Sequence, residues 1–152
     1  MYIILVGAGN VGVQLAKRFI ARGHEVLLME KDSTQARKLG ALLGDEHVIH
    51  GDGCDIAVQK ESGFGRADVV AAVTGEDEDN LVVCQLAKSV WGVKRVLARV
   101  NDPTHEDIFR DLGIDDTVSA TSIIFNLIDQ QIAANELIPI GALHRGNVEV
   151  VE

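Results

Sequence analysis

The stretch Tyr2-Ile-Ile-Leu-Val-Gly-Ala-Gly-Asn-Val-Gly12 decides the fold. Its five apolar residues, Tyr2–Val6, predict a short buried strand that stops at a glycine. The pattern G-x-G-x-x-G follows directly, and apolar residues at helical spacing predict a helix over residues 11–21. A strand, this glycine pattern and a helix in direct succession are typical of a nucleotide-binding βαβ unit.

Each glycine of this loop has its own expected task. Gly7 permits the tight turn after the strand, and Gly9, which has no Cβ, lets a pyrophosphate approach the backbone. Gly12 lets the helix pack closely against the strand. The free N–H groups at the start of the helix would then face the phosphates. A purely structural turn is the alternative interpretation of the same pattern.

Glu30 ends the predicted second strand, 18 residues after Gly12. A carboxylate at this position can accept hydrogen bonds from both hydroxyls of an adenosine ribose. This carboxylate would repel a 2′-phosphate, so the sequence disfavours NADP as the ligand. The positive charge of Lys31 beside it weakens this repulsion a little. The alternative is a solvated acid at the end of a strand.

Strand and helix patterns alternate along the rest of the chain. Such alternation predicts an α/β fold with a doubly wound parallel sheet of six strands in the order 3-2-1-4-5-6. Further strands are expected at residues 25–29, 47–50, 68–73, 95–100 and 116–119. Helices are expected at 33–43 with Ser33 as cap, weakly after 51–55, at 78–91, from Pro103 to Leu112, and from a cap at Thr121 or Ser122 to Asn135.

Several candidate ligand contacts fall just after predicted strands, at the edge where doubly wound sheets bind ligands. Asp52, or a backbone group near it and Cys54, could contact the adenine edge, but a plain turn explains this stretch equally well. Thr74 and Gly75 leave room for a dinucleotide to cross the crevice. Arg99 ends the fifth strand and could pair with a phosphate. The acidic run at residues 76–79 favours the first turn of a helix over a metal site.

The sequence lacks a clear reaction centre. The single tyrosine, Tyr2, begins the first strand, which excludes the tyrosine chemistry of short-chain dehydrogenases. His105 is the one histidine expected near a nicotinamide, and we interpret it as a solvated residue at a helix start. A second domain that could close over a substrate is not evident. A nucleotide-binding module of this kind is expected to act as a sensor.

Composition excludes several other classes. The 152 residues are 47% apolar and 24% charged, which is typical of one globular domain. A net charge of −9 argues against nucleic acid and anionic membrane surfaces as partners. No apolar run approaches the roughly 18 residues of a membrane span, and no secretory leader is expected. Cys54 and Cys84 are expected to be reduced thiols in a cytosolic protein.

Taken in order, the motifs resemble the RCK domain (regulator of potassium conductance), also called the TrkA-N domain, of Trk/Ktr-type potassium-uptake regulators. The resemblance covers about residues 1–135. It is carried by Ile3-Ile-Leu-Val-Gly-Ala-Gly-Asn-Val-Gly12 with Leu15-Ala16, by Glu30-Lys-Asp32, by Gly51-Asp-Gly-Cys-Asp55, by Val73-Thr-Gly75 leading to Asp79-Asn80, by Ala98-Arg-Val-Asn101 and by Leu112-Gly-Ile-Asp115.

This resemblance implies a cytosolic, non-enzymatic subunit that binds NAD(H) or ATP/ADP and gates ion transport. The ATP-responsive branch often has an arginine inside the glycine loop, where this chain has Asn10 and Val11. The sequence therefore favours NAD(H), with ATP, ADP or AMP left open. The implied nucleotide contacts are Gly7, Ala8, Gly9, Asn10, Val11, Gly12, Glu30, Lys31, Asp52, Cys54, Thr74, Gly75 and Arg99, with no catalytic and no metal residues.

The resemblance also implies an organisation and partners. Residues 1–135 would form the nucleotide-binding domain, including a crossover helix at 121–135, and residues 136–152 a linker or the first strand of a truncated subdomain. Apolar residues spread over more than one face of that helix, which predicts a homodimer or a ring. The expected partner is a potassium-transporting membrane protein, which would hold the subunit at the inner face of the membrane without insertion or nucleic-acid binding.

Two other classes fit parts of the sequence. A small NAD-dependent oxidoreductase fragment would share the glycine loop, but it would need an acid or base that the chain lacks. A redox-sensing repressor would need a basic DNA-binding element, and the net charge of −9 argues against one.

Overall fold

The structure is a computed structural model, and it describes residues 1–137. The chain divides into two units, Met1–Ser119 and a second unit that starts at Ala120. Within the described residues, no helix combines the length and the apolar character that crossing a membrane requires.

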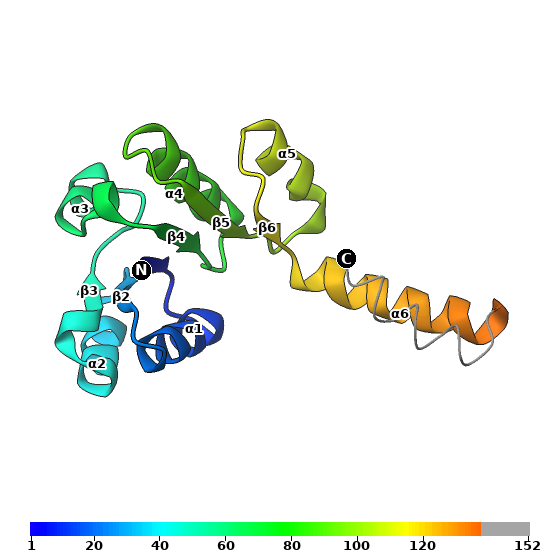
Figure 1. The fold of residues 1–152 in the computed structure, drawn as a ribbon, viewed down its shortest axis with the longest axis horizontal. Coiled ribbons are helices and arrows are strands. Elements are labelled where there is room, and N and C mark those ends of the chain that lie inside the picture. The colour runs from blue at the N-terminus through cyan, green and yellow to red at the C-terminus, as the bar shows by residue number, and fades with distance from the viewer. Residues whose placement is uncertain (138–152) are drawn as a thin grey trace. The chain divides into compact units, whose positions relative to one another are not determined.

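The first unit is built on a six-stranded parallel sheet (Figure 1). The strand order is β3-β2-β1-β4-β5-β6, which confirms the predicted doubly wound topology. The strands are β1 (Tyr2–Val6), β2 (Glu25–Glu30), β3 (Val48–His50), β4 (Val69–Ala72), β5 (Arg95–Arg99) and β6 (Thr117–Val118).

The helices lie close to their predicted positions. They are α1 (Asn10–Ala21), α2 (Ser33–Leu43), α3 (Ile56–Glu61), α4 (Asp77–Ser89), α5 (Glu106–Asp111) and α6 (Ala120–Leu137).

Three predicted helix starts are corrected. The cap of α2 is Asp32, whose carboxylate accepts a hydrogen bond from the Thr34 N–H at 3.0 Å, and Ser33 is already helical. The helix expected from Pro103 begins as a short 3₁₀ turn, Pro103–His105, and continues as α5. Helix α6 starts at Ala120, ahead of the predicted cap residues.

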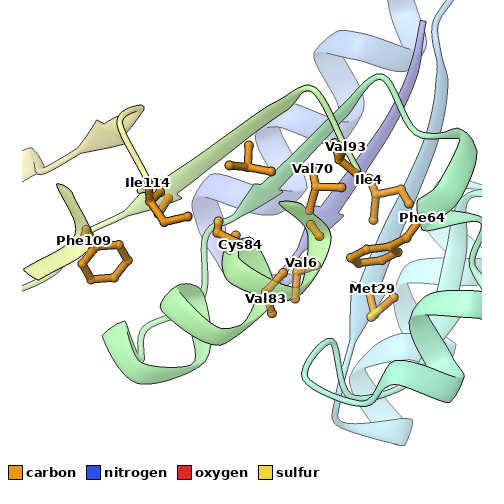
Figure 2. Close-up of a cluster of buried hydrophobic side chains, with 14 of the residues drawn as sticks. Ile4, Val6, Met29, Phe64, Val70, Val83, Cys84, Val93, Phe109 and Ile114 are labelled. Carbon is orange, nitrogen blue, oxygen red and sulfur yellow. The ribbon is translucent and has the colours of Figure 1, made fainter. Parts of the chain in front are cut away.

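Helices cover both faces of the sheet because alternate side chains of each strand point to opposite faces. Ile3 and Leu5 of β1 pack with Ala16 of α1 and Leu39 of α2. On the other face, Tyr2, Ile4 and Val6 belong to a second cluster with residues of α4 and the segment after α3. Figure 2 shows this second cluster, which includes Phe64, Val83, Cys84, Phe109 and Ile114.

The strand register aligns the carboxyl ends of the strands. Val6 of β1 pairs with Met29 of β2 and with Ala72 of β4. At the outer pair, Arg99 of β5 lies opposite Val118 of β6. The loops that follow these strands therefore meet at one edge of the sheet, where doubly wound folds bind their ligands.

Candidate functional site

A cleft of about 400 Å³ lies at this edge, beyond the carboxyl ends of β1 and β4. The strand order reverses between these two strands, so the cleft occupies the topological switch point. Its lining comes from the ends of β1, β2 and β5, from the loops after β1 to β4, and from Asp79 and Val83 of α4. Of the predicted contact residues, the cleft brings together Gly7, Ala8, Gly9, Glu30, Lys31, Asp52, Cys54, Thr74, Gly75 and Arg99.

Close backbone contacts shape the base of the cleft. Gly7 has a φ of +108°, and a Cβ on it would lie 2.8 Å from the Thr74 nitrogen. A Cβ on Gly12 would lie 1.9 Å from the carbonyl oxygen of Gly7, so α1 can start against the loop only because residue 12 is glycine. The Cβ position of Gly9 has free space within 4 Å. A ligand can therefore reach the backbone at Gly9.

Three predicted contacts lie outside the lining of the cleft. Asn10 and Val11 face a shallow depression on α1 together with Gln14, Leu15 and Arg18, and Gly12 is covered by the loop. Their predicted contacts use backbone N–H groups, and the first N–H groups of a helix have no intrahelical acceptor. Binding through this helix start stays a prediction.

Glu30 is fixed against the glycine loop at the end of β2. One carboxylate oxygen accepts a hydrogen bond from the Ala8 N–H at 3.2 Å, and the other accepts from the Asp32 N–H at 2.9 Å. The carboxylate is therefore oriented before any ligand arrives, and its remaining lone pairs can accept hydroxyl protons.

Lys31 and Cys54 both interact with Asp79 of α4. The Lys31 ammonium lies 3.8 Å from the Asp79 carboxylate; Lys31 is well exposed and Asp79 is half-buried. The Cys54 thiol contacts the Asp79 carbonyl oxygen at 3.8 Å. Burial, together with the charges of Asp79 and Asp52, raises the pKa of Cys54 to about 11. Cys54 is therefore a protonated thiol at neutral pH and a poor nucleophile.

The loop after β3 is a compact turn. The Asp52 carboxylate accepts a hydrogen bond from the Cys54 N–H at 2.9 Å, so its first role is to hold its own loop. A Cβ on Gly53 would lie 2.5 Å from the Val6 side chain, which shows how tightly this loop packs on β1. The predicted adenine contact of Asp52 stays a prediction.

Sequence reasoning missed the role of Asn80, which is fully buried in α4. Its amide oxygen accepts hydrogen bonds from the backbone N–H and the hydroxyl of Thr74, at 3.0 and 2.6 Å. Its amide nitrogen donates to the carbonyl oxygens of Thr74 and Arg99, at 3.1 and 2.8 Å. Asn80 therefore ties the ends of β4 and β5 together on the cleft side of the sheet.

Asp77 is a second missed residue, and only 7% of it is exposed. Its carboxylate accepts hydrogen bonds from the N–H and the side chain of Asn101, from the Asp102 N–H and from His105. Burial opposes ionisation, but these hydrogen bonds outweigh it and hold the pKa of Asp77 below its ordinary value. The Asn101 side chain also donates to the Thr74 carbonyl at 3.1 Å, which connects this network to the cleft.

His105 lies at a helix start, as predicted, and 36% of its side chain is exposed, but the sequence interpretation missed its two carboxylate partners. Its Nδ1 lies 2.8 Å from the Asp77 carboxylate, and its Nε2 lies 3.7 Å from the Asp102 carboxylate. The hydrogen bond to Asp77 raises the pKa of His105, and the charge of Asp102 adds to the rise. His105 therefore holds the loop after β5 and does not line the cleft.

Arg99 contributes a cation to the cleft. Within the described residues, no hydrogen bond or ion pair engages its guanidinium group, so this charge is free to meet an anion. In the same part of the chain, no cluster of histidine, cysteine or acidic residues could hold a metal ion. Phosphate is the ligand group that glycine loops and a free guanidinium recognise.

The fold and the cleft define a Rossmann-like domain of the nucleotide-binding type. The family model described as the TrkA-N domain matches residues 3–120. The chain therefore belongs to the TrkA-N domain family.

Curated relatives agree with this assignment. The whole chain aligns with 69% of a Trk system potassium uptake protein TrkA homolog from Methanothermobacter thermautotrophicus at 34% identity. It also aligns over its whole length with 69% of the Trk system potassium uptake protein TrkA of Mycobacterium tuberculosis at 32% identity.

Solved structures share the fold at lower identity. The TrkA-N domain of the inner membrane protein ybaL from Escherichia coli has a TM-score of 0.76 at 15% identity, covering 86% of this chain and 95% of that one. The GsuK channel bound to NAD has a TM-score of 0.68 at 22% identity over 77% of this chain and 21% of that one. The Kef C-terminal domain of Shewanella denitrificans in its AMP-bound form has a TM-score of 0.74 at 16% identity, covering 96% and 88%.

Proposed function

We propose that this chain is a nucleotide-sensing regulatory subunit of a potassium transporter or channel. The observation that carries the proposal is one cleft at the switch point that gathers the glycine loop, Glu30 and Arg99. The backbone at Gly9 can take a phosphate, Glu30 a ribose and Arg99 a second phosphate. Relatives named as Trk potassium uptake proteins support the transport role.

NAD(H) is the proposed ligand, with ADP, ATP and AMP as the alternatives. Structural neighbours whose names include NAD and AMP support an adenine nucleotide. The oriented Glu30 carboxylate favours a ribose with both hydroxyls free over one with a 2′-phosphate. Lys31, which could attract a 2′-phosphate, is paired with Asp79.

Calorimetric titration of the full chain with NAD(H), NADP(H), ADP and AMP tests the ligand. We expect NAD(H) to bind more tightly than NADP(H). We expect Gly9→Val to abolish binding, because a side chain there fills the space that lets a pyrophosphate approach the backbone. The protein should stay folded, because a Cβ at this position has no atom within 4 Å. Gly65→Ala, at a glycine outside the cleft, is the control. If NADP(H) binds as tightly as NAD(H), Glu30 does not bind the ribose as proposed. If Gly9→Val binds normally, the glycine loop does not bind the phosphates.

The proposed role does not include catalysis. Tyr2, the only tyrosine, lies outside the cleft lining and donates its hydroxyl proton to the Ser62 carbonyl. The cysteine in the cleft has a pKa of about 11. NADH oxidation that depends on an added hydroxy acid or aldehyde, and that is lost in His105→Gln, would instead favour an oxidoreductase.

We further propose that the subunit forms homodimers through α6 and works in the cytoplasm, docked on a potassium-transporting membrane protein. The support comes from six large apolar side chains of α6, each at least 50% exposed in the single chain. Shielding them from water in a two-fold interface is favourable. They are Ile123, Ile124, Phe125, Leu127, Ile128 and Ile132.

Sedimentation equilibrium at micromolar concentration tests the dimer. We expect Phe125→Asp to dissociate it, because the new carboxylate would be buried in an apolar interface. Asn126→Asp adds the same charge at a neighbouring polar residue and is the matched control. A monomeric wild-type chain, with and without nucleotide, would contradict the proposed assembly.

A further inference from the structure

Gln59 lies behind the cleft and is not part of its lining. It belongs to α3, its side chain is fully buried, and both ends of its amide are used. Nε2 donates a hydrogen bond to the carbonyl oxygen of Gly53 at 2.6 Å, and Oε1 accepts one from the indole Nε1–H of Trp91 at 2.8 Å. Gln59 therefore connects a loop of the cleft to the segment after α4.

Chemistry settles the orientation of this amide. An indole N–H can only donate and a backbone carbonyl can only accept, so the oxygen of Gln59 must face Trp91 and its nitrogen must face Gly53. Trp91 thus locks the rotamer that lets Gln59 donate to the loop. If the Trp91 donor were lost, Oε1 of Gln59 would be buried without a partner, and the amide would be held only by its hydrogen bond to Gly53.

The hydrogen bond from Gln59 to Gly53 fixes the orientation of one peptide group in the wall of the cleft. The C=O of Gly53 and the N–H of Cys54 belong to the same planar trans peptide and point in opposite directions. Gln59 holds the C=O end, and the Asp52 carboxylate accepts from the N–H end at 2.9 Å. Both residues that flank Gly53, Asp52 and Cys54, line the cleft. The direction of this peptide plane therefore sets the shape of the cleft wall beyond β3.

This wall lies where a nucleotide would place its base. Glu30 of β2 is the expected ribose acceptor, and Glu30 pairs with His50 at the end of β3, directly before the loop. A ribose at Glu30 with its phosphate at Gly9 leaves the base to lie toward the loop of Asp52–Cys54.

We propose that Gln59, locked by Trp91, is a positioning residue that presents the Gly53–Cys54 peptide to the base of the bound nucleotide. The proposal rests on the proposed nucleotide-binding function and extends it to two residues outside the cleft. It assigns them an effect on the base alone, because their hydrogen bonds reach the loop at Gly53 and not the phosphate site at Gly7–Gly9.

Titration of the full chain with ADP, and competition with inorganic pyrophosphate as a base-free probe, tests this assignment. Gln59→Met keeps the length of the side chain and removes both hydrogen bonds, and Trp91→Phe removes only the indole donor. We expect ADP affinity to fall about tenfold in Gln59→Met and about threefold in Trp91→Phe, with pyrophosphate affinity unchanged in both. Thermal unfolding monitored by circular dichroism shows that each variant is folded.

The outcomes separate the two proposals. If the wild-type chain binds neither ADP nor NAD(H), the proposed function fails. If the wild type binds ADP and folded Gln59→Met binds it equally well, the positioning role fails. Equal losses for ADP and pyrophosphate would show a general structural role and also overturn it. If Gln59→Met does not fold, Trp91→Phe decides, and unchanged ADP affinity in that variant overturns the proposal.

Discussion

Around β1 and β2 the cleft is formed by closely packed backbone, whereas around β4 and β5 it is held by buried side-chain hydrogen bonds. In the first half, Gly7 and Gly12 allow contacts that any Cβ would break. In the second half, the side chains of Asn80 and Asp77 together make eight hydrogen bonds. Their partners are Thr74, Arg99, Asn101, Asp102 and His105. The first half therefore depends mainly on the absence of side chains at Gly7 and Gly12, with the Glu30 carboxylate as an added hold on the Ala8 N–H. The second half depends on the particular side chains of Asn80 and Asp77.

The largest effect is expected from a side chain at Gly12. Gly12→Ala places a Cβ 1.9 Å from the Gly7 carbonyl oxygen, so α1 must move away from the loop. We expect the free energy of unfolding to fall by about 3 kcal/mol, since overpacking outweighs the better helix propensity of alanine. Urea unfolding measures this loss.

Gly9→Ala is the matched control for that change. Its Cβ meets no atom within 4 Å, so the loss should not exceed about 1 kcal/mol, the cost of alanine at the N-cap position that Gly9 occupies. Equal stability of Gly12→Ala and Gly9→Ala would contradict the view that backbone packing builds this half of the cleft.

A smaller loss is expected in the second half. Asn80→Ala leaves the Thr74 N–H and the Arg99 carbonyl without the partner that Asn80 supplies. Unsatisfied buried groups of this kind cost about 2 kcal/mol in the free energy of unfolding. Urea unfolding again provides the measurement, with Asn10→Ala on the exposed surface of α1 as the control. A change no larger than that of the control would show that the amide network does not hold β4 to β5.

The smallest effect concerns pH. The pKa of His105 is raised in the folded protein by its hydrogen bond to Asp77, so folding favours the protonated ring. The stability that this pair contributes is fully present below the unfolded-state pKa of about 6.5 and is lost as pH rises through the higher folded-state pKa. We expect the free energy of unfolding to fall over this window above pH 6.5.

Measuring urea unfolding at several pH values checks this expectation. His105→Gln should flatten the decline, because a neutral amide can still donate to Asp77 but does not titrate in this range. The same slope in wild type and variant would place the titrating group elsewhere. The effect is small because Asn101 and the Asp102 N–H continue to hold Asp77 when His105 loses its proton.

These two halves also differ in how far sequence predicts them. The glycine loop and Glu30 form a local pattern with fixed spacing, so sequence alone identifies them. The alternation of strands and helices repeats along the chain, so it predicts the sheet order. The spacing of Gly12 from Gly7 already implies the close contact that the structure has.

The hydrogen-bond network could not be predicted in this way. Asp77 meets His105 at a separation of 28 residues, and Gln59 meets Trp91 at 32, with no periodicity to connect them. Asn80 gives the one available signal, since an amide directly before an apolar stretch of a helix needs a buried partner. The acidic run at 76–79 predicts the start of α4 correctly, but its sequence gives no sign that Asp77 turns inward.

The charge around the cleft has a consequence for the kinetics of binding. Four acidic residues line it, Glu30, Asp52, Glu76 and Asp79, against the two cations Lys31 and Arg99, in a chain of net charge −9. An anionic ligand therefore approaches against a repulsive field and is attracted only close to Arg99 and the helix start. Dissolved ions screen that field, so we expect the association rate of an anionic ligand to rise with added salt. Enzymes that attract their substrates by charge show the opposite salt dependence.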